Sequence, residues 1–252
     1  MTPSQKGLLH STIAVAVIAA LVFWARSGKE KEDAPPEDNR PPTPVPAETS
    51  ATIRGIVSFK GSPPAPAPLN PSGDCPHLKG KDAGDIRVAD GKVQNAVVWV
   101  SGGLENFVPA PKREPPLTVD QKECMYDPRV SAAQVRQKVT FHNGEGRVHN
   151  VHVRGPEEFA KTLTLQGDAF DKHFSGAGLY TMTCDLHSHM KAYLHVFPHG
   201  YFALTGKDGA FALPPINPGK YTVTAWHEVF GEKKQDMEVK AKEEKAIEFV
   251  YP

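Results

Sequence analysis

The sequence predicts an all-β protein preceded by one N-terminal hydrophobic helix. From Thr52 onward, short runs rich in β-branched residues alternate with turn signals, as in proteins built from short strands. The chain's 24 prolines and 21 glycines in 252 residues also suit strands and turns better than a helical bundle. The helix is predicted because the eighteen residues from Leu8 to Ala25 contain no charged side chain.

The N-terminal segment predicts export. Residues 1–26 are a signal peptide or a transmembrane anchor, and both alternatives stay open because small residues near Ala25 would permit cleavage. Residues 27–50 carry six prolines and nine charges, which predicts a disordered linker. We therefore expect an exported protein on the periplasmic or cell-surface side, anchored in the membrane by residues 8–25.

The charge balance excludes one class of partner. Lysine and arginine total 29, as do aspartate and glutamate, so the formal net charge is zero. A dedicated nucleic-acid-binding protein needs a basic surplus to neutralise phosphates. We expect no nucleic-acid partner.

Strands are predicted near both ends of the remaining chain. Early ones are expected at 52–60 and 93–100, and later ones at 201–205, 210–213, 221–227, 237–239 and 246–251. The stretch D-G-A-F-A-L-P-P-I-N-P-G-K-Y at 208–221 resembles the carboxypeptidase regulatory-like domain, a small β-sandwich. The resemblance implies that residues 52–104 and 199–252 form one split module, into which residues 105–198 are inserted.

The inserted segment contains candidate metal ligands. Cys184, His187 and Met190 follow one another with C-x2-H-x2-M spacing, and V-H-N-V-H-V at 148–153 supplies a second source of histidine. A trigonal set of two histidines and a cysteine, with a weak axial methionine, selects copper and suits one-electron transfer. We therefore expect a copper site.

Strand alternation favours one of the two upstream histidines. His149 shares a face with Val151 and Val153, which marks that face as the inward one. His149 is therefore the predicted ligand. His152 remains the alternative, because a β-bulge near the site would reverse the alternation.

The segment from Tyr126 to Phe197 resembles cupredoxins of the plastocyanin and amicyanin type. The resemblance lies in V-T-F-H-N at 139–143, H-N-V-H at 149–152, G-L-Y-T-M-T-C at 178–184 and the short, amicyanin-like spacing of the ligand loop. It implies a Greek-key β-sandwich over residues 105–198 that holds one type 1-like copper ion.

The same resemblance implies a ligand set. The four copper ligands it implies are His149, Cys184, His187 and Met190. It also implies that Asn150 ties the two ligand loops together. The sequence departs from amicyanin at Ser188 and His189, which replace proline and phenylalanine, and His189 is therefore an alternative candidate ligand.

The other cysteines predict a disulfide. With Cys184 assigned to the metal, Cys75 and Cys124 are left to pair, as expected in an exported protein. In the alternative, Cys75 and His77 bind another metal, but no second pair of ligands accompanies them.

The remaining histidines are expected to be structural. For His189, His195 and His199 the expected position is an exposed polar face of the strand after the ligand loop. His199 and the segment His227–Glu228 are expected to form a buried hydrogen-bonded pair, and a second metal site is the alternative.

These features together predict a copper-binding one-electron carrier and not an enzyme. The sequence lacks G-x-S-x-G, P-loop and G-x-G-x-x-G motifs. We expect a redox partner protein. The alternatives are copper trafficking or storage, a surface interaction module without metal, and a catalytic copper centre.

Overall fold

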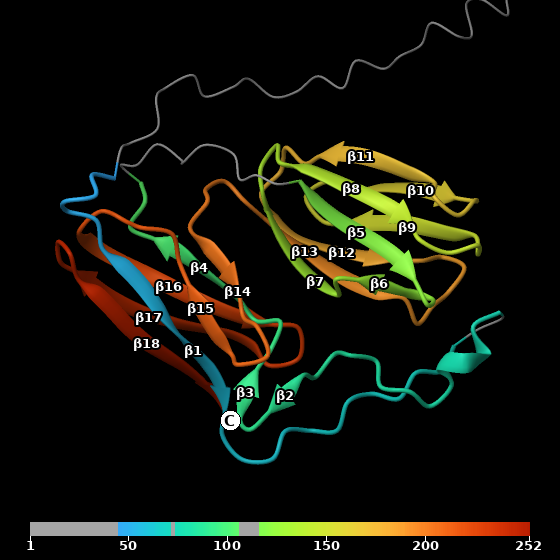
Figure 1. Ribbon diagram of the computed structural model, residues 1–252, viewed down its shortest axis with the longest axis horizontal. Helices are drawn as coiled ribbons and strands as arrows, with labels where there is room; N and C mark the ends of the chain where they lie inside the picture. The colour runs from blue at the N-terminus through green and yellow to red at the C-terminus, as the bar shows by residue number, and fades with distance from the viewer. Residues whose placement is uncertain (1–44, 72–73, 106–115) are drawn as a thin grey trace, which may run out of the picture. The chain divides into compact units, whose positions relative to one another are not determined.

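The computed structural model describes residues 45–71, 74–105 and 116–252. In this part of the chain the all-β prediction is confirmed: eighteen strands form four sheets, and the single helical element is a 3-10 turn, η1 (Pro76–Leu78) (Figure 1). The predicted N-terminal helix lies outside the described residues. Among the described residues, none belongs to a helix with the length and apolarity needed to span a bilayer.

Two sheets come from the early and late parts of the chain, and we call them the outer sandwich. One has the order β15-β1-β3-β2, with β18 also paired to β1: β1 (Thr52–Phe59), β2 (Val88–Ala89), β3 (Lys92–Val93), β15 (Ala210–Ala212) and β18 (Glu244–Tyr251). The other has the order β14-β4-β16-β17: β4 (Val97–Gly102), β14 (Phe202–Leu204), β16 (Gly219–His227) and β17 (Gly231–Val239). Residues far apart in sequence therefore share each sheet.

Alternating side chains fill the outer sandwich. Ile53 and Val57 of β1 are fully buried in one cluster with Val98 of β4 and Val223 of β16. The turn before β15 depends on Gly209, whose φ of +68° favours glycine and whose added Cβ would lie 2.5 Å from the carbonyl oxygen of Val57. This turn brings β15 against β1.

The other two sheets come from the middle of the chain, and we call them the inner sandwich. One has the order β10-β9-β12-β13-β7: β7 (Val130–Gln134), β9 (His149–Arg154), β10 (Phe159–Leu163), β12 (Gly178–Thr183) and β13 (Lys191–Phe197). The other has the order β11-β8-β5-β6: β5 (Leu117–Lys122), β6 (Met125–Asp127), β8 (Lys138–Asn143) and β11 (Ala169–His173). The pairs β5–β8 and β7–β13 are parallel, so β-hairpins alone do not connect these sheets.

The inner sandwich has its own core. Its buried cluster includes Phe141, Val151, Tyr180, Met182 and Leu194, each at most 1% exposed. All members of this cluster lie between residues 119 and 196, whereas the outer cluster draws on residues 51–100 and 201–251. Each sandwich thus has a core of its own, and two smaller buried clusters lie outside these cores.

A disulfide joins the loop after β1 to the hairpin between β5 and β6. Cys75 and Cys124 are bonded across 49 residues, and both are fully buried. Glu123 and Cys124 have φ values of +51° and +58°, as the two central residues of a tight hairpin turn do. Leu69, Leu78 and Ala83 pack around the disulfide. The loop after β1 is therefore fixed beside the inner sandwich.

Aromatic and ionic contacts join β13 and β7 to strands of the outer sandwich. The His195 ring lies 4.5 Å from that of Trp226 and 5.7 Å from that of Trp99. The guanidinium of Arg129 donates two hydrogen bonds, of 2.6 and 2.7 Å, to the Glu228 carboxylate. Both charged side chains are largely buried, so losing either one would leave the other without its counter-ion.

The structure corrects the expectation that three histidines lie on an exposed face. His195 is only 6% exposed, and His189 and His199 are partly buried. The strand was expected to face water, but one sheet of the outer sandwich packs against it, with Trp99 of β4 and Trp226 of β16 beside the imidazole of His195. The sequence pattern does not show this contact because its partners are distant in the chain.

The predicted pair of His199 and His227 is also wrong. Nδ1 of His199 accepts a hydrogen bond from the Tyr201 backbone N–H, and Nδ1 of His227 accepts one from that of Val229. Glu228 binds Arg129 instead. In the described ranges these residues also do not meet as a group of metal ligands.

Burial of His195 predicts a pH-dependent stability. Desolvation lowers the pKa of His195 from 6.5 to about 4. The unfolded chain therefore binds more protons in this range, and the free energy of unfolding falls as the pH drops from 6.5 towards 4. We expect His195→Phe, which keeps a flat ring among the aromatic side chains, to reduce the slope of unfolding free energy against pH. The reduction should correspond to about one proton fewer taken up on unfolding. Urea unfolding across this pH range measures the slope, and an unchanged slope would contradict the prediction.

Candidate metal centre

Three candidate ligands meet at one end of the paired strands β9 and β12. His149 begins β9, Cys184 directly follows β12, and His187 lies in the loop between β12 and β13. A nitrogen of each histidine and the Cys184 sulfur all lie within 4.8 Å of one another, and all three residues are buried. Because β9 and β12 pair antiparallel, the first residue of β9 and the last residue of β12 lie at the same end of the sheet.

His149 has one nitrogen engaged and one unpartnered. Its Nε2 lies 2.7 Å from Oε1 of Glu145, while its Nδ1 is buried and without a hydrogen bond. Burial lowers the pKa of His149, and Glu145 opposes this shift. A neutral imidazole that donates through Nε2 presents a free lone pair at Nδ1, which is the form that binds metals.

His187 also has a carboxylate at Nε2, but its Nδ1 has a partner. Its Nε2 lies 2.7 Å from Oδ1 of Asp74, and its Nδ1 lies 3.6 Å from Sγ of Cys184. The rings of His187 and His149 are 4.8 Å apart. Each histidine therefore has Nε2 beside a carboxylate.

Backbone hydrogen bonds hold the strands beside the cysteine. The Asn150 backbone N–H donates to Sγ of Cys184 at 3.3 Å. The Tyr126 hydroxyl lies 2.7 Å from the Asn150 carbonyl oxygen and 2.9 Å from that of Thr183. Asn150 was predicted to tie the ligand loops together. Its backbone atoms make these contacts, while its side-chain Oδ1 is buried without a hydrogen bond.

The remaining candidate ligands occupy different environments. Met190 is fully buried in the same cluster as Cys184, and its backbone N–H donates to the His187 carbonyl. His152, the alternative to His149, turns away from the three grouped ligands and lies 2.7 Å from Asp185. Nε2 of His189 lies 3.1 Å from the Cys124 carbonyl oxygen, which identifies it as the donor of a hydrogen bond.

The three grouped residues fit a soft or borderline transition metal. One thiol and two imidazole nitrogens converge, and the unpartnered Nδ1 of His149 gives a buried lone pair that a metal would satisfy. A second grouping of Asp74 and Cys75 with His187 does not qualify, because the Cys75 sulfur belongs to the disulfide. The chemistry of the donors therefore favours copper over oxygen-binding cations.

Residues that the sequence did not reveal surround the ligands. Glu145 accepts hydrogen bonds from the Cys124 backbone N–H and from Arg147. Although burial opposes it, these contacts and His149 lower the pKa of Glu145. The contact between Glu145 and His149 could have been predicted from the sequence, because the two residues are only four positions apart. The contact between Asp74 and His187 could not, because these residues are 113 positions apart.

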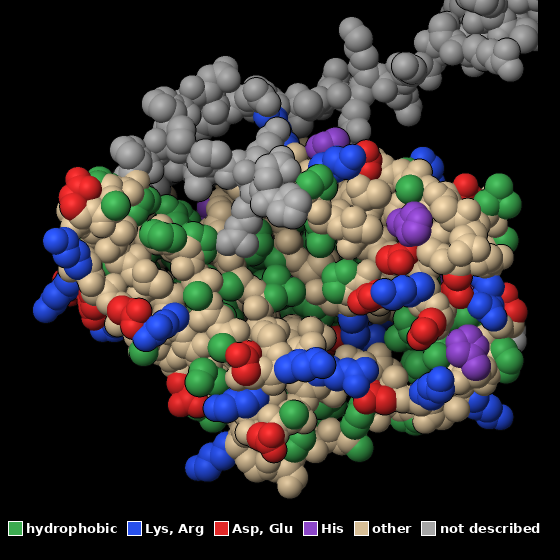
Figure 2. Space-filling model, viewed as in Figure 1, with side chains coloured by type: hydrophobic (Ala, Val, Ile, Leu, Met, Phe, Trp, Pro, Cys, Tyr) green, Lys and Arg blue, Asp and Glu red, His purple; other side chains and the backbone are tan. Residues whose placement is uncertain are grey.

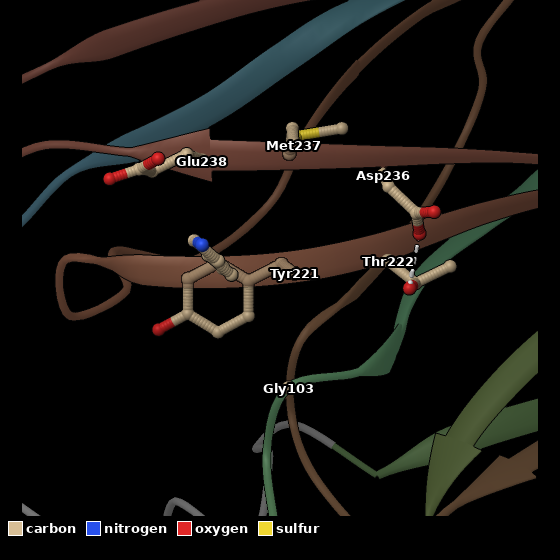
Figure 3. Close-up of a pocket in the computed structure, with 7 residues that line it drawn as sticks. Gly103, Tyr221, Thr222, Asp236, Met237 and Glu238 are labelled. Carbon is tan, nitrogen blue, oxygen red and sulfur yellow. Dashed lines mark hydrogen bonds between the residues drawn. The ribbon is translucent and has the colours of Figure 1, made fainter.

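In the part of the chain that the structure describes, the hollow over β16 and β17 does not offer a comparable site. On the face drawn in Figure 2, basic and acidic side chains are interspersed over the described surface. A shallow hollow of about 440 Å³ lies over β16 and β17 (Figure 3). Its lining contains no histidine or cysteine, and its Asp236 accepts a hydrogen bond from Thr222 at 2.6 Å. This hollow is not a second metal site of the same kind.

Comparisons with known proteins give partial structural matches. No protein-family model matches the chain, and no curated protein does. A Cu-containing nitrite reductase from Thermus scotoductus SA-01 is 28% identical with a TM-score of 0.31, over 36% of this chain and 24% of that chain. A purple cupredoxin from Nitrosopumilus maritimus is 20% identical with a TM-score of 0.29, over 32% of this chain and 98% of that chain.

An oxidised amicyanin mutant is 24% identical with a TM-score of 0.31, over 35% of this chain and 89% of that chain. Cupredoxins are among the similar structures. The match spans 24% of the length of the nitrite reductase, and the TM-scores are 0.29 to 0.31.

The hydroxyl of Tyr126 provides a test of how the ligand strands are held. We expect Tyr126→Phe to lower the free energy of unfolding by about 1–3 kcal/mol, because the carbonyls of Asn150 and Thr183 each lose one hydrogen bond, while Gln121 still donates to that of Asn150. Urea unfolding of the metal-free protein measures this. The matched control is Tyr193→Phe, whose hydroxyl has no hydrogen bond among the described residues. Equal stabilities of the two variants would show that the Tyr126 contact is not stabilising.

Proposed function

We propose that this chain is a copper-binding, cupredoxin-like protein that carries single electrons outside the cytoplasm. The observation that carries the proposal is the buried grouping of His149, Cys184 and His187, with Nδ1 of His149 left without a hydrogen bond. A buried polar atom without a partner costs about 1–3 kcal/mol, and a metal ion bound beside Cys184 and His187 would offset that cost at Nδ1 of His149.

The donor set supports copper as the metal. A thiolate with two imidazoles is the trigonal set that suits blue-copper centres, and the proposed axial ligand is the buried Met190. One copper ion per chain would supply a reversible one-electron couple. If Met190 were a fourth ligand beside His149, Cys184 and His187, the protein would supply all four ligands, which favours an electron carrier over an enzyme.

The protein's part in this function is to hold the ligands in place. Tyr126 and the backbone of Asn150 fix the ends of the ligand strands, and the buried side chains around Cys184 exclude water from the sulfur. Ligands that are already positioned change little between oxidation states. A low reorganisation cost of this kind favours rapid electron exchange with a partner protein.

The surrounding segments support a location outside the cytoplasm. The Cys75–Cys124 disulfide is typical of exported proteins. In this proposal residues 1–26 export or anchor the chain, residues 27–50 form a linker, and the outer sandwich is a carboxypeptidase regulatory-like module interrupted by the cupredoxin-like segment. Its partners are a redox protein and, through residues 8–25, a membrane.

Copper trafficking or storage is the second candidate function. One observation favours it: the His187 side chain is 5% exposed and Asp74 lies against its Nε2, which limits contact between the ligand and a redox partner. A trafficking protein would hold Cu(I) without turnover. The oxidation state that the site stabilises therefore discriminates between the two functions.

Copper titration followed by absorption spectroscopy tests the proposal. We expect one equivalent of Cu(II) to give a strong visible thiolate-to-copper band that disappears on one-electron reduction and returns on reoxidation. Cys184→Ser should abolish the band, because the thiolate produces it. Ser188→Ala, an exposed change in the same loop, should retain it.

The other outcomes are also decisive. A colourless protein that binds Cu(I) alone would support trafficking, and absence of copper uptake would rule out both functions. A band that persists in Cys184→Ser would mean that the thiolate ligand is misassigned.

A further inference from the structure

The loop between β1 and β2 brings a carboxylate to the proposed metal centre. Asp74 of this loop precedes Cys75, and the disulfide to Cys124 anchors it beside the inner sandwich. Arg147, from the loop between β8 and β9, donates a hydrogen bond of 3.2 Å to the Asp74 carbonyl. The position of Asp74 is therefore fixed on both sides, by a covalent bond next to it and by a side chain of the inner sandwich.

Asp74 makes one contact with a candidate ligand. Its Oδ1 lies 2.7 Å from Nε2 of His187. The His187 side chain is 5% exposed and that of Asp74 is 61% exposed, so the carboxylate is the outermost group at this edge of the imidazole.

A second carboxylate occupies the equivalent position at the other histidine. Glu145 lies 2.7 Å from Nε2 of His149, and its side chain is 13% exposed. The same oxygen of Glu145 accepts a hydrogen bond from the backbone N–H of Cys124, the disulfide partner of Cys75. The disulfide is therefore adjacent to both carboxylate–imidazole pairs.

We propose that Asp74 is a positioning residue for the metal centre: its hydrogen bond with His187 keeps the proton on Nε2 and directs Nδ1 towards Cys184. This inference rests on the proposed copper-binding function. A carboxylate on the far nitrogen of a ligating histidine fixes the tautomer and ring orientation and raises the basicity of the ligand. The more basic ligand stabilises Cu(II) more than Cu(I), so Asp74 tightens Cu(II) binding and lowers the reduction potential.

The hydrogen bond, not the charge of Asp74, is the larger part of this effect. Because the Asp74 side chain is mostly exposed, water and salt screen its charge at the metal position. Asp185 provides a comparison, because its exposed carboxylate directly follows Cys184 in the chain but contacts His152 and neither grouped histidine. Removing the charge of either Asp74 or Asp185 changes the electric field near the site. Only the removal of Asp74 also removes a hydrogen bond to a candidate ligand, His187.

Three variants separate these contributions. Asp74→Ala removes both charge and hydrogen bond, and Asp74→Asn removes the charge but keeps an acceptor oxygen. Asp185→Asn is the matched control. We expect Asp74→Ala to lower Cu(II) affinity about 10–100-fold and to raise the reduction potential, with a smaller effect in Asp74→Asn. The control should bind Cu(II) as the unaltered chain does, and equal affinities in Asp74→Ala and the control would overturn the inference.

A measurement without metal distinguishes this inference from the proposed function. In the metal-free chain, ¹H–¹⁵N spectra of the imidazoles should show His187 in the Nε2–H tautomer, and Asp74→Ala should give a mixture of tautomers. A mixture in the unaltered chain would overturn the role of Asp74. If the tautomers behave as expected but the unaltered chain takes up no copper, the proposed function fails and the positioning contact remains.

Discussion

The candidate site depends on one unsatisfied atom, Nδ1 of His149, which the fold keeps buried and without a hydrogen bond. Proteins rarely leave such an atom unpaired, because desolvation is not compensated. Here the other nitrogen of the ring is engaged by Glu145, so the ring cannot turn to satisfy Nδ1 without losing that contact. The arrangement prepares a lone pair next to Cys184 and His187, which is what a transition metal requires.

The rest of the structure explains how this arrangement is maintained. β9 and β12 bring His149 and Cys184 to the same end of the sheet, and the Tyr126 hydroxyl donates to a backbone carbonyl of each strand. The loop with Asp74 comes from the outer sandwich and is joined by the disulfide to the inner one. A loop of the outer sandwich thus contributes a residue to the candidate metal centre, in addition to the packing of this sandwich against β7 and β13.

The sequence allowed the β class and the grouped donors to be predicted, because both depend on local patterns. The C-x2-H-x2-M spacing identified Cys184 and His187, and strand alternation favoured His149 over His152. In the structure it is His149 that lies with Cys184 and His187. Contacts between distant segments were not predictable in this way. Asp74 is remote in sequence from His187, and His195 was expected in water because nothing in its own strand indicates the tryptophans packed against it.

X-ray absorption at the copper edge, on the chain loaded with one equivalent of copper, tests the central claim most directly. The account predicts that a single sulfur and two imidazole nitrogens form the nearest shell of scattering atoms, as Cys184, His149 and His187 would provide. A nearest shell of oxygen and nitrogen without sulfur would contradict it, because copper would then lie away from the thiol on which the proposed function depends.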